Sequence, residues 1–230
     1  MSLLVCYGGS FDPVHAGHLA VACAVRDGLG AQVRLLPAAD PPHKPSTFAG
    51  QSERAHMLAL AIGDQPDLVL DLREYTRPGP SWTVDTLHSL RAELGAGQPI
   101  AWLVGSDALP GLHTWHDWPR LFELAHVLVV ERPGAPLDLA HLRDHSPTVH
   151  AALQARRRDA GQLADSPGGG YAGVTLPQLR TESSTEVRRR IAAGLSCDGM
   201  LAPAVAAYIR QHALYGPPAV PGHPGLTGTV

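Results

Sequence analysis

The sequence predicts an α/β fold with a doubly wound, mostly parallel sheet and helices on both faces. Short runs rich in β-branched and other apolar residues alternate with longer amphipathic stretches, as in β-α-β units. The chain has 230 residues, enough for one sizeable core, and 44% of them are hydrophobic against 17% charged. That balance excludes a disordered chain.

Six strands and seven helices are expected, each justified by its own pattern. Apolar runs of four to six residues suit buried strands and lie at 3–7, 32–37, 68–71, 100–104, 127–131 and 173–176. Amphipathic stretches suit helices and lie at 18–29, 52–62, 83–94, 119–124, 148–159, 185–193 and 203–214. Gly194 and Gly216 are expected to stop the last two helices.

The chain is expected to form one domain over residues 1–215. Residues 216–230 are rich in Pro and Gly and offer no periodic apolar face, so we expect a flexible tail. Segment 133–170 ends in SPGGG, which suits a mobile loop better than a core element.

Charge and cysteine usage narrow the class of protein. The formal net charge is −3, so no general attraction to nucleic acid or to an anionic membrane is expected. Cys6, Cys23 and Cys197 form no CxxC pair, and we interpret them as small buried hydrophobes, not as a zinc site or disulfide framework. No apolar stretch approaches the roughly 20 residues that span a bilayer, which favours a soluble cytoplasmic protein.

The segment GGSFDPVHAGHL, residues 8–19, stands where the first strand passes into the first helix. The adjacent glycines Gly8 and Gly9 let backbone amides approach a ligand, and a helix start offers unpaired N–H groups and a positive dipole end. His15 and His18 are three residues apart, so both can point at one anion. The segment therefore predicts a phosphate site, although a lone histidine near a helix start would fit an ordinary turn.

A second segment also suggests a contact with an anion. PAADPPHKP, residues 37–45, follows the second strand, and its prolines can hold His43 and Lys44 rigidly at the ligand crevice. Lys44 is the only lysine of the chain and is a candidate phosphate contact, or else a solvated lysine on a rigid turn.

The segment ESSTEVRRRIAAG, residues 182–194, predicts a helix whose first residues form a capping box, because Glu186 follows Ser183 by three positions. The same helix start presents amides and hydroxyls, with Arg188 one turn in and able to reach phosphates. Arg189 and Arg190 point elsewhere and are expected to form a solvated edge.

GGSFDPVHAGHL resembles the signature of the HxGH nucleotidyltransferases, the adenylyl- and cytidylyltransferases with a Rossmann-like doubly wound sheet. The chain also has PSWT at 80–83, GSD at 105–107 and HTWHDW at 113–118. With these segments, residues 3–215 resemble the bacterial nicotinate mononucleotide adenylyltransferases. Glu182 departs from that pattern, which usually has an apolar residue there, and either repels a phosphate or faces solvent. Ser10 stands where a threonine is common and keeps the hydroxyl.

The resemblance assigns roles to particular residues. It implies that phosphate chemistry is carried by His15, His18, Lys44 and Arg188. ATP is expected to contact Gly8, Gly9, Ser10, Phe11, Gly105, Asp107, Ser183, Ser184 and Thr185. Nicotinate mononucleotide is expected to contact Trp82, Thr83 and Trp115 around its ring and Arg132 or Lys44 at its phosphate.

The implied reaction transfers the adenylyl group of ATP to nicotinate mononucleotide, a step of NAD biosynthesis. The acceptor phosphate has a second pKa of about 6, so it is already ionised at neutral pH and needs no general base. The sequence shows no tight carboxylate cluster for a metal, and Mg²⁺ is expected to arrive with ATP, keeping several waters.

Alternatives remain at this point. The acceptor can instead be nicotinamide mononucleotide, FMN or phosphopantetheine, although phosphopantetheine enzymes are shorter and carry TxGH where this chain has HAGH. A nucleotide-binding regulator without turnover is the alternative from a different class, and the presence of His15, His18 and Arg188 argues against it.

Overall fold

The computed structural model describes residues 1–40, 47–131, 137–175 and 182–216. Its sheet has six strands in the order β3-β2-β1-β4-β5-β6, and every neighbouring pair is parallel. The strands are β1 Leu4–Gly9, β2 Gln32–Pro37, β3 Leu68–Leu70, β4 Ile100–Gly105, β5 His126–Glu131 and β6 Tyr171–Thr175. The predicted doubly wound parallel sheet is confirmed, and each predicted strand overlaps an observed one.

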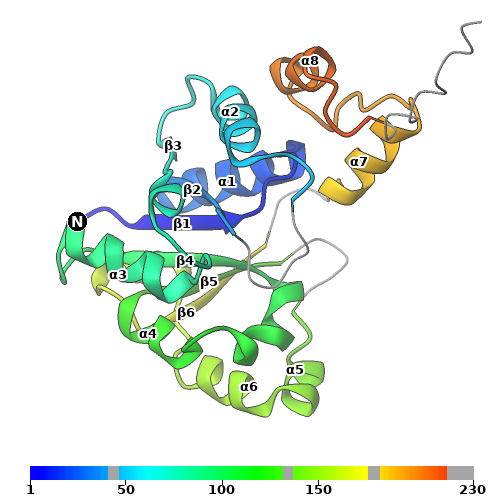
Figure 1. Ribbon diagram of the computed structural model, residues 1–230. Helices are drawn as coiled ribbons and strands as arrows, with labels where there is room; N and C mark the ends of the chain where they lie inside the picture. Colours follow the sequence, from blue (N-terminus) through cyan, green and yellow to red (C-terminus); the bar gives the residue numbers. More distant parts are fainter. Residues whose placement is uncertain (41–46, 132–136, 176–181, 217–230) are drawn as a thin grey trace, which may run out of the picture.

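Helices cover both faces of the sheet (Figure 1). On one face lie α1 Ala16–Leu29, α2 Gln51–Ile62 and α8 Pro203–Gln211. On the other lie α3 Thr83–Leu94, α4 Leu121–Leu124, α5 Leu139–His145 and α6 Pro147–Gln154. The remaining helix, α7 Ser184–Ala192, lies beyond the edge of the first face, beside the start of α1 (Figure 1).

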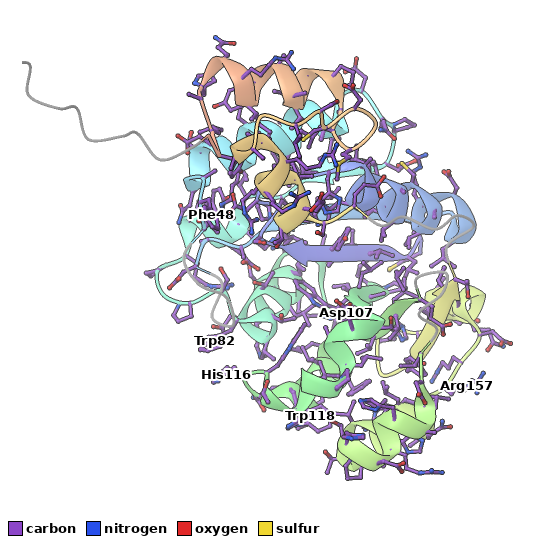
Figure 2. The ribbon with its side chains drawn as sticks, turned by 90° about the vertical axis from the view of Figure 1, so that its right-hand side faces the viewer. Phe48, Trp82, Asp107, His116, Trp118 and Arg157 are labelled. Atoms are coloured by element: carbon purple, nitrogen blue, oxygen red, sulfur yellow. The ribbon has the colours of Figure 1, made fainter. Side chains whose placement is uncertain are left out.

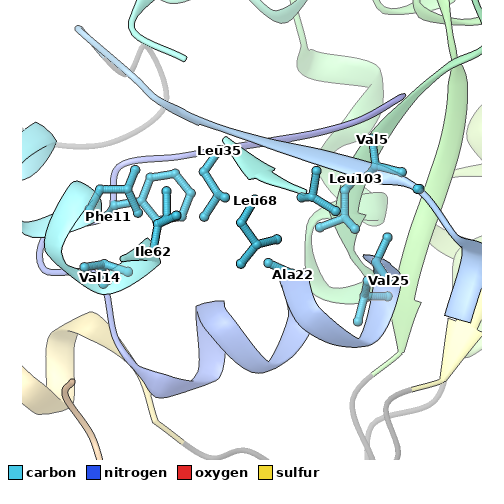
Figure 3. Packing of buried hydrophobic residues seen from close by; sticks show 14 of the residues in the cluster. Val5, Phe11, Val14, Ala22, Val25, Leu35, Ile62, Leu68 and Leu103 are labelled. Carbon is cyan, nitrogen blue, oxygen red and sulfur yellow. The ribbon is translucent and has the colours of Figure 1, made fainter. Parts of the chain in front are cut away.

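Two hydrophobic clusters sandwich the sheet, because side chains alternate between the faces of each strand. Val5, Leu35 and Leu103 point toward α1 and pack with Ala22 and Val25 (Figure 3). Residues one position away on the same strands point to the other face, where Cys6, Leu36 and Trp102 pack with α3. Both faces being buried explains why the strands are continuous apolar runs.

Strand order reverses between β1 and β4, since β2 and β3 lie on one side of β1 and β5 and β6 lie beyond β4. In an open parallel sheet the crevice beyond the carboxyl ends of the strands at this reversal is the usual ligand site. Here those ends are Gly9 and Gly105.

The described part of segment 133–170 is mostly helical, and SPGGG at its end forms a loop without helix or strand, as predicted. Residues 137–170 hold α5, α6 and a 3₁₀ helix at Ala160–Asp165, and the helix expected at 148–159 ends at Gln154. Leu142, Val149 and Leu153 are buried in the cluster under α3. In the SPGGG segment, Gly168 lies so close to the Ala125 backbone that a Cβ would stand 3.0 Å from its nitrogen. The glycines serve close packing there, because no side chain fits.

The C-terminal region and the cysteines match their predicted structure and burial in part. The helix expected at 203–214 ends at Gln211, and residues 217–230 of the predicted tail lie outside the described part of the chain. Cys6 is buried, as expected, and burial raises its pKa to about 12, whereas Cys23 and Cys197 are only partly buried. Among the described residues, no helix is long and apolar enough to cross a membrane.

Candidate functional site

The loop from β1 to α1 contains the two predicted histidines. His15 is the residue before α1 and is buried, and the rings of His15 and His18 lie 3.7 Å apart between centroids. The backbone N–H of His15 donates to Nδ1 of His18 at 3.2 Å. Because Nδ1 accepts this bond, the neutral His18 ring carries its proton on Nε2, the nitrogen on the far side. The local structure therefore makes His18 a directed N–H donor.

Aromatic packing holds the His18 ring in place. Phe11 is 1% exposed and its ring meets the ring of His18 edge-on, with 5.0 Å between centroids. Tyr7 packs on both, 5.5 Å from Phe11 and 6.1 Å from His18. The side chain of Phe11, a candidate ATP contact, thus lies in the core behind His18.

Helix α7 reaches the same loop from the far end of the chain. The hydroxyl of Ser184 donates to the carbonyl of Pro13 at 2.9 Å, and Arg188 donates to the carbonyl of Asp12. Ser183 accepts a hydrogen bond from the Glu186 N–H at 3.1 Å, as the capping pattern predicts. We call His15, His18 and Arg188 the His–Arg cluster, since two segments about 170 residues apart in the chain bring them to one loop.

The guanidinium of Arg188 has a defined position. Its carbon lies 4.4 Å from the centroid of the Phe48 ring, which is labelled beside α7 in Figure 2, and one of its nitrogens donates to the Thr185 hydroxyl at 3.3 Å. The neighbouring Arg189 is exposed and forms an ion pair with Glu186 at 2.7 Å, which confirms its expected place on the solvated edge.

A cavity of about 460 Å³ opens at the carboxyl ends of β1 and β4, where the strand order reverses. Of the predicted site residues, the following line it: Gly8, Gly9, Ser10, Trp82, Thr83, Gly105, Asp107 and Trp115. A Cβ on Gly8 would stand 2.5 Å from the ring of Trp102, so a glycine is required for that ring to reach the cavity wall. We call this space the aromatic cavity.

The mouth of the aromatic cavity is formed by stacked rings. Trp82 and His116 lie 4.9 Å apart between centroids, inclined by 28°, and both are labelled in Figure 2. Among the lining residues that the structure describes, His116 is the one side chain that can carry a positive charge, against the carboxyls of Glu74 and Asp107. His116 is the second histidine of the segment HTWHDW, and no local pattern in the sequence distinguished it from a solvated histidine.

Glu74 is a buried carboxyl of the cavity wall that sequence reasoning missed. It accepts a hydrogen bond from the hydroxyl of Thr86 at 2.7 Å, and burial raises its pKa above the ordinary range. Arg77 donates to the same hydroxyl at 3.1 Å and to the carbonyl of Trp82 at 3.4 Å. The group holds the start of α3, and with it Trp82, in place.

Arg54 is a second residue that sequence reasoning missed. It is fully buried and donates to the carbonyls of Ser10 at 2.8 Å and Ala38 at 2.7 Å. A buried guanidinium thus ties together the loops that leave β1 and β2. Nothing in the amphipathic pattern of α2 distinguished this arginine from a solvated one.

Other predicted residues divide into three groups. Lys44 and Arg132, with His43, lie outside the described residues. The His–Arg cluster does not line the aromatic cavity, and the two regions meet at Gly8–Ser10, which line the cavity and precede the histidines. Glu182 is partly buried, so it does not simply face solvent, and its carbonyl would lie 3.5 Å from a Cβ on Gly17.

The carboxylates do not gather around one point. In the described part of the chain, no group of three or more His, Cys, Asp or Glu residues lies close enough to hold a metal ion. A side-chain oxygen of Asp107 occupies the space that a Cβ on Gly105 would need, so this carboxylate folds back over the end of β4. A carboxylate in this position suits a sugar hydroxyl or a metal-bound water.

Comparison with known proteins finds one family model and relatives that carry the same name. Residues 6–190 match the cytidylyltransferase-like family model. A protein of Stenotrophomonas maltophilia named as a probable nicotinate-nucleotide adenylyltransferase is 51% identical over 224 residues, covering 95% of this chain and 99% of its own. A protein of the same name from Xylella fastidiosa strain M12 is 42% identical, covering 94% and 97%.

The fold also matches solved structures. The nicotinic acid mononucleotide adenylyltransferase of Plasmodium falciparum, solved in complex with NaAD, superimposes with a TM-score of 0.70. The alignment covers 94% of this chain and 98% of that one, at 17% identity. At that identity the likeness concerns the fold alone.

Proposed function

The chain belongs to the cytidylyltransferase-like family, and we propose that it transfers the adenylyl group of ATP to nicotinate mononucleotide, giving nicotinate adenine dinucleotide and pyrophosphate. This reaction is a step of NAD biosynthesis. The observation that carries the proposal is the aromatic cavity at the strand-order reversal, which adjoins the loop of the His–Arg cluster. The names of relatives that are 51% and 42% identical along nearly the whole chain support the same acceptor.

The proposed transfer reaction needs no general base. An oxygen of the acceptor 5′-phosphate attacks the α-phosphorus of ATP, a new P–O bond forms, and the bond to the bridging oxygen of pyrophosphate breaks. The attacking phosphate is already ionised, because its second pKa is about 6. The protein must therefore bring two polyanions together and stabilise the charge on the transferred group and on the leaving pyrophosphate.

The His–Arg cluster suits that task. His18 presents an Nε2–H donor fixed by the His15 N–H and by packing on Phe11, so it can strengthen a hydrogen bond to the α-phosphate as charge develops. His15 stands at the start of α1, where the helix dipole favours an anion. Arg188 supplies a guanidinium for the β- and γ-phosphates from the start of α7, together with the hydroxyls there.

Trp82, Thr83 and Trp115 are the proposed ring contacts, because they line the aromatic cavity. Gly105 and Asp107 are the proposed contacts of the sugars, because they line the same cavity at the end of β4. We also propose Lys44 and Arg132 as contacts of the acceptor phosphate, a role that rests on the family resemblance. Residues 1–215 are proposed as the transferase domain, and the cytoplasm as its location.

Mg²⁺ is the proposed cofactor, carried in with ATP and keeping several of its waters. Its charge partly neutralises the triphosphate when it is bound. The scattered carboxylates of the described residues fit an ion that arrives with the nucleotide better than a resident one.

Pyrophosphate release with ATP and Mg²⁺ tests the proposal. Nicotinate mononucleotide, nicotinamide mononucleotide and phosphopantetheine are compared as acceptors at equal concentration. We expect clear preference for nicotinate mononucleotide. Preference for another acceptor would overturn the assignment of the aromatic cavity but keep the ATP site, and no release with any acceptor would favour a nucleotide-binding regulator.

A further inference from the structure

The described chain ends beside the loop that carries the His–Arg cluster. The hydroxyl of Tyr215 donates a hydrogen bond of 2.7 Å to a carboxylate oxygen of Asp12, a residue 203 positions earlier in the chain. Asp12 is 3% exposed, so this contact lies inside the protein. Burial, together with the bond to Asp12, raises the pKa of Tyr215, and its hydroxyl therefore remains a donor throughout the neutral range.

The Asp12 carboxylate also organises the loop that follows the undescribed residues 41–46. It accepts the backbone N–H of Phe48 at 2.7 Å and that of Ala49 at 3.1 Å. Together with the tyrosine hydroxyl, three donors converge on one carboxylate. A buried carboxylate is expensive unless its oxygens are bonded, so the loss of any one donor strains the arrangement.

Beside its bond to the Thr185 hydroxyl, Arg188 has two contacts that involve Asp12 or a residue held by the Asp12 carboxylate. Arg188 donates to the main-chain carbonyl of Asp12, and its guanidinium lies over the ring of Phe48, whose N–H the Asp12 side chain holds. A displaced Asp12 therefore moves the carbonyl and the ring that orient the guanidinium. Tyr215 itself makes none of the contacts with Arg188 that fix its direction.

We propose that Tyr215 is a positioning residue for the nucleotide: through Asp12 it fixes the Phe48–Ala49 loop and the Arg188 guanidinium that receives the ATP phosphates. The short segment after the last helix, α8, thereby completes a site whose other parts come from the first forty-nine residues and from α7. This inference rests on the proposed function only in that the ligand of Arg188 is a nucleoside triphosphate.

The test compares Tyr215→Phe with Tyr208→Phe. Both changes remove one hydroxyl from the same end of the chain, but the Tyr208 hydroxyl bonds no described residue, and its ring packs at a tilt against those of His56 and His212. Binding of a non-hydrolysable ATP analogue is measured by calorimetry with Mg²⁺ present, and the KM values for ATP and for nicotinate mononucleotide are measured separately. Because the binding measurement needs no acceptor, it remains valid even if the wild-type protein forms no product with nicotinate mononucleotide.

For Tyr215→Phe we expect the dissociation constant of the ATP analogue and the KM for ATP to rise about tenfold, since a hydrogen bond to a charged acceptor is worth roughly that factor or more. The KM for nicotinate mononucleotide should change less than about twofold, and Tyr208→Phe should leave all three values unchanged. Unchanged ATP binding in Tyr215→Phe would overturn the proposal. So would an equal rise of both KM values with a lowered Tm, which indicates a purely structural role.

A double-mutant cycle supplies the second measurement. If Tyr215 acts through Asp12, then Asp12→Asn with Tyr215→Phe should weaken binding of the ATP analogue no more than Asp12→Asn alone. Independent, multiplying effects of the two substitutions would show that Tyr215 acts by another route and would contradict the proposal.

Discussion

The His–Arg cluster and the aromatic cavity are built in different ways. The cluster joins the start of α1 to the start of α7, with Arg188 bonded to a carbonyl 176 residues away. The cavity is lined largely by the ends of β1 and β4 and by the residues around Trp82 and Trp115. The His–Arg cluster presents hydrogen-bond donors held in fixed directions, whereas the aromatic cavity presents aromatic rings.

This contrast fits the two tasks of the proposed reaction. Stabilising a charged transition state requires donors held to within fractions of an ångström, and each cluster residue has a bonded or packed support. Recognition of a planar ring depends on contact area and tolerates small shifts. We therefore expect substitutions in the cluster to alter kcat and ATP binding, and substitutions in the cavity to alter acceptor binding.

The largest effect is expected for His18→Ala. It removes the Nε2–H donor, and kcat should fall by about 10²-fold or more, as for other donors to a developing charge. Steady-state turnover with saturating ATP and nicotinate mononucleotide measures it. His141→Ala, at an exposed position of α5, is the matched control and should retain normal kcat. Near-normal turnover of His18→Ala would remove His18 from the mechanism.

Arg188→Ala should raise the KM for ATP by about 10- to 100-fold, the range expected for hydrogen bonds to a charged group. The KM for nicotinate mononucleotide should change little. Arg189→Ala is the control, because that arginine is exposed and pairs with Glu186. Equal KM values for ATP in the two variants would break the comparison, since α7 would then contribute only its backbone.

Trp82→Ala tests the other region. We expect the KM for nicotinate mononucleotide to rise about tenfold, because stacking of a base on an aromatic ring is worth about 1–3 kcal/mol. The KM for ATP should stay within about twofold of its normal value. Trp118→Ala makes the same change outside the cavity lining and should leave both KM values alone. A rise in the KM for ATP alone would reassign the cavity to the nucleotide.

A smaller effect, on stability, is expected at Glu74. Burial raises its pKa above the ordinary 4.5, so the folded state favours the neutral carboxyl. The stability it contributes is complete below pH 4.5 and is lost as pH rises through the raised value. Glu74→Gln keeps a neutral side chain, and its Tm relative to wild type should therefore increase from pH 4.5 toward pH 8.

Glu93→Gln serves as the control of opposite sign. The hydrogen bond from Arg73, followed by that from Arg34, lowers the pKa of Glu93 below 4.5, so its contribution is present above that pH. Its replacement should lower Tm at pH 7 and lose its effect in acid. The same pH trend in both variants would contradict the assignment for Glu74.

The smallest effect is expected from a truncation after Tyr215. It removes residues 216–230 but keeps the hydroxyl that bonds Asp12. Activity and Tm should match those of the full chain in the pyrophosphate assay and in thermal unfolding. Lost activity would place a contribution to the site in the tail, and would sharpen the comparison by extending the C-terminal support of the His–Arg cluster.

Local patterns in the sequence were enough to predict the alternation of strands and helices, the glycine-containing turn between β1 and α1 and the capped start of α7. Each depends on local information: a run of apolar residues, a glycine pair before a helix, or a serine three residues before a glutamate. The helix at Thr83–Leu94 and the strand at Gln32–Pro37 were predicted to the residue, since both have clear ends.

Contacts between residues far apart in the chain became apparent only in the folded structure. The Asp12–Tyr215 bond, the burial of Arg54 and the stacking of Trp82 on His116 join segments between 34 and 203 residues apart, and no local pattern encodes such a partner. Helix α5, Leu139–His145, was missed for a related reason. Its few apolar residues gain order only by packing under the sheet, because the hydrophobic surface that stabilises them belongs to other segments of the chain.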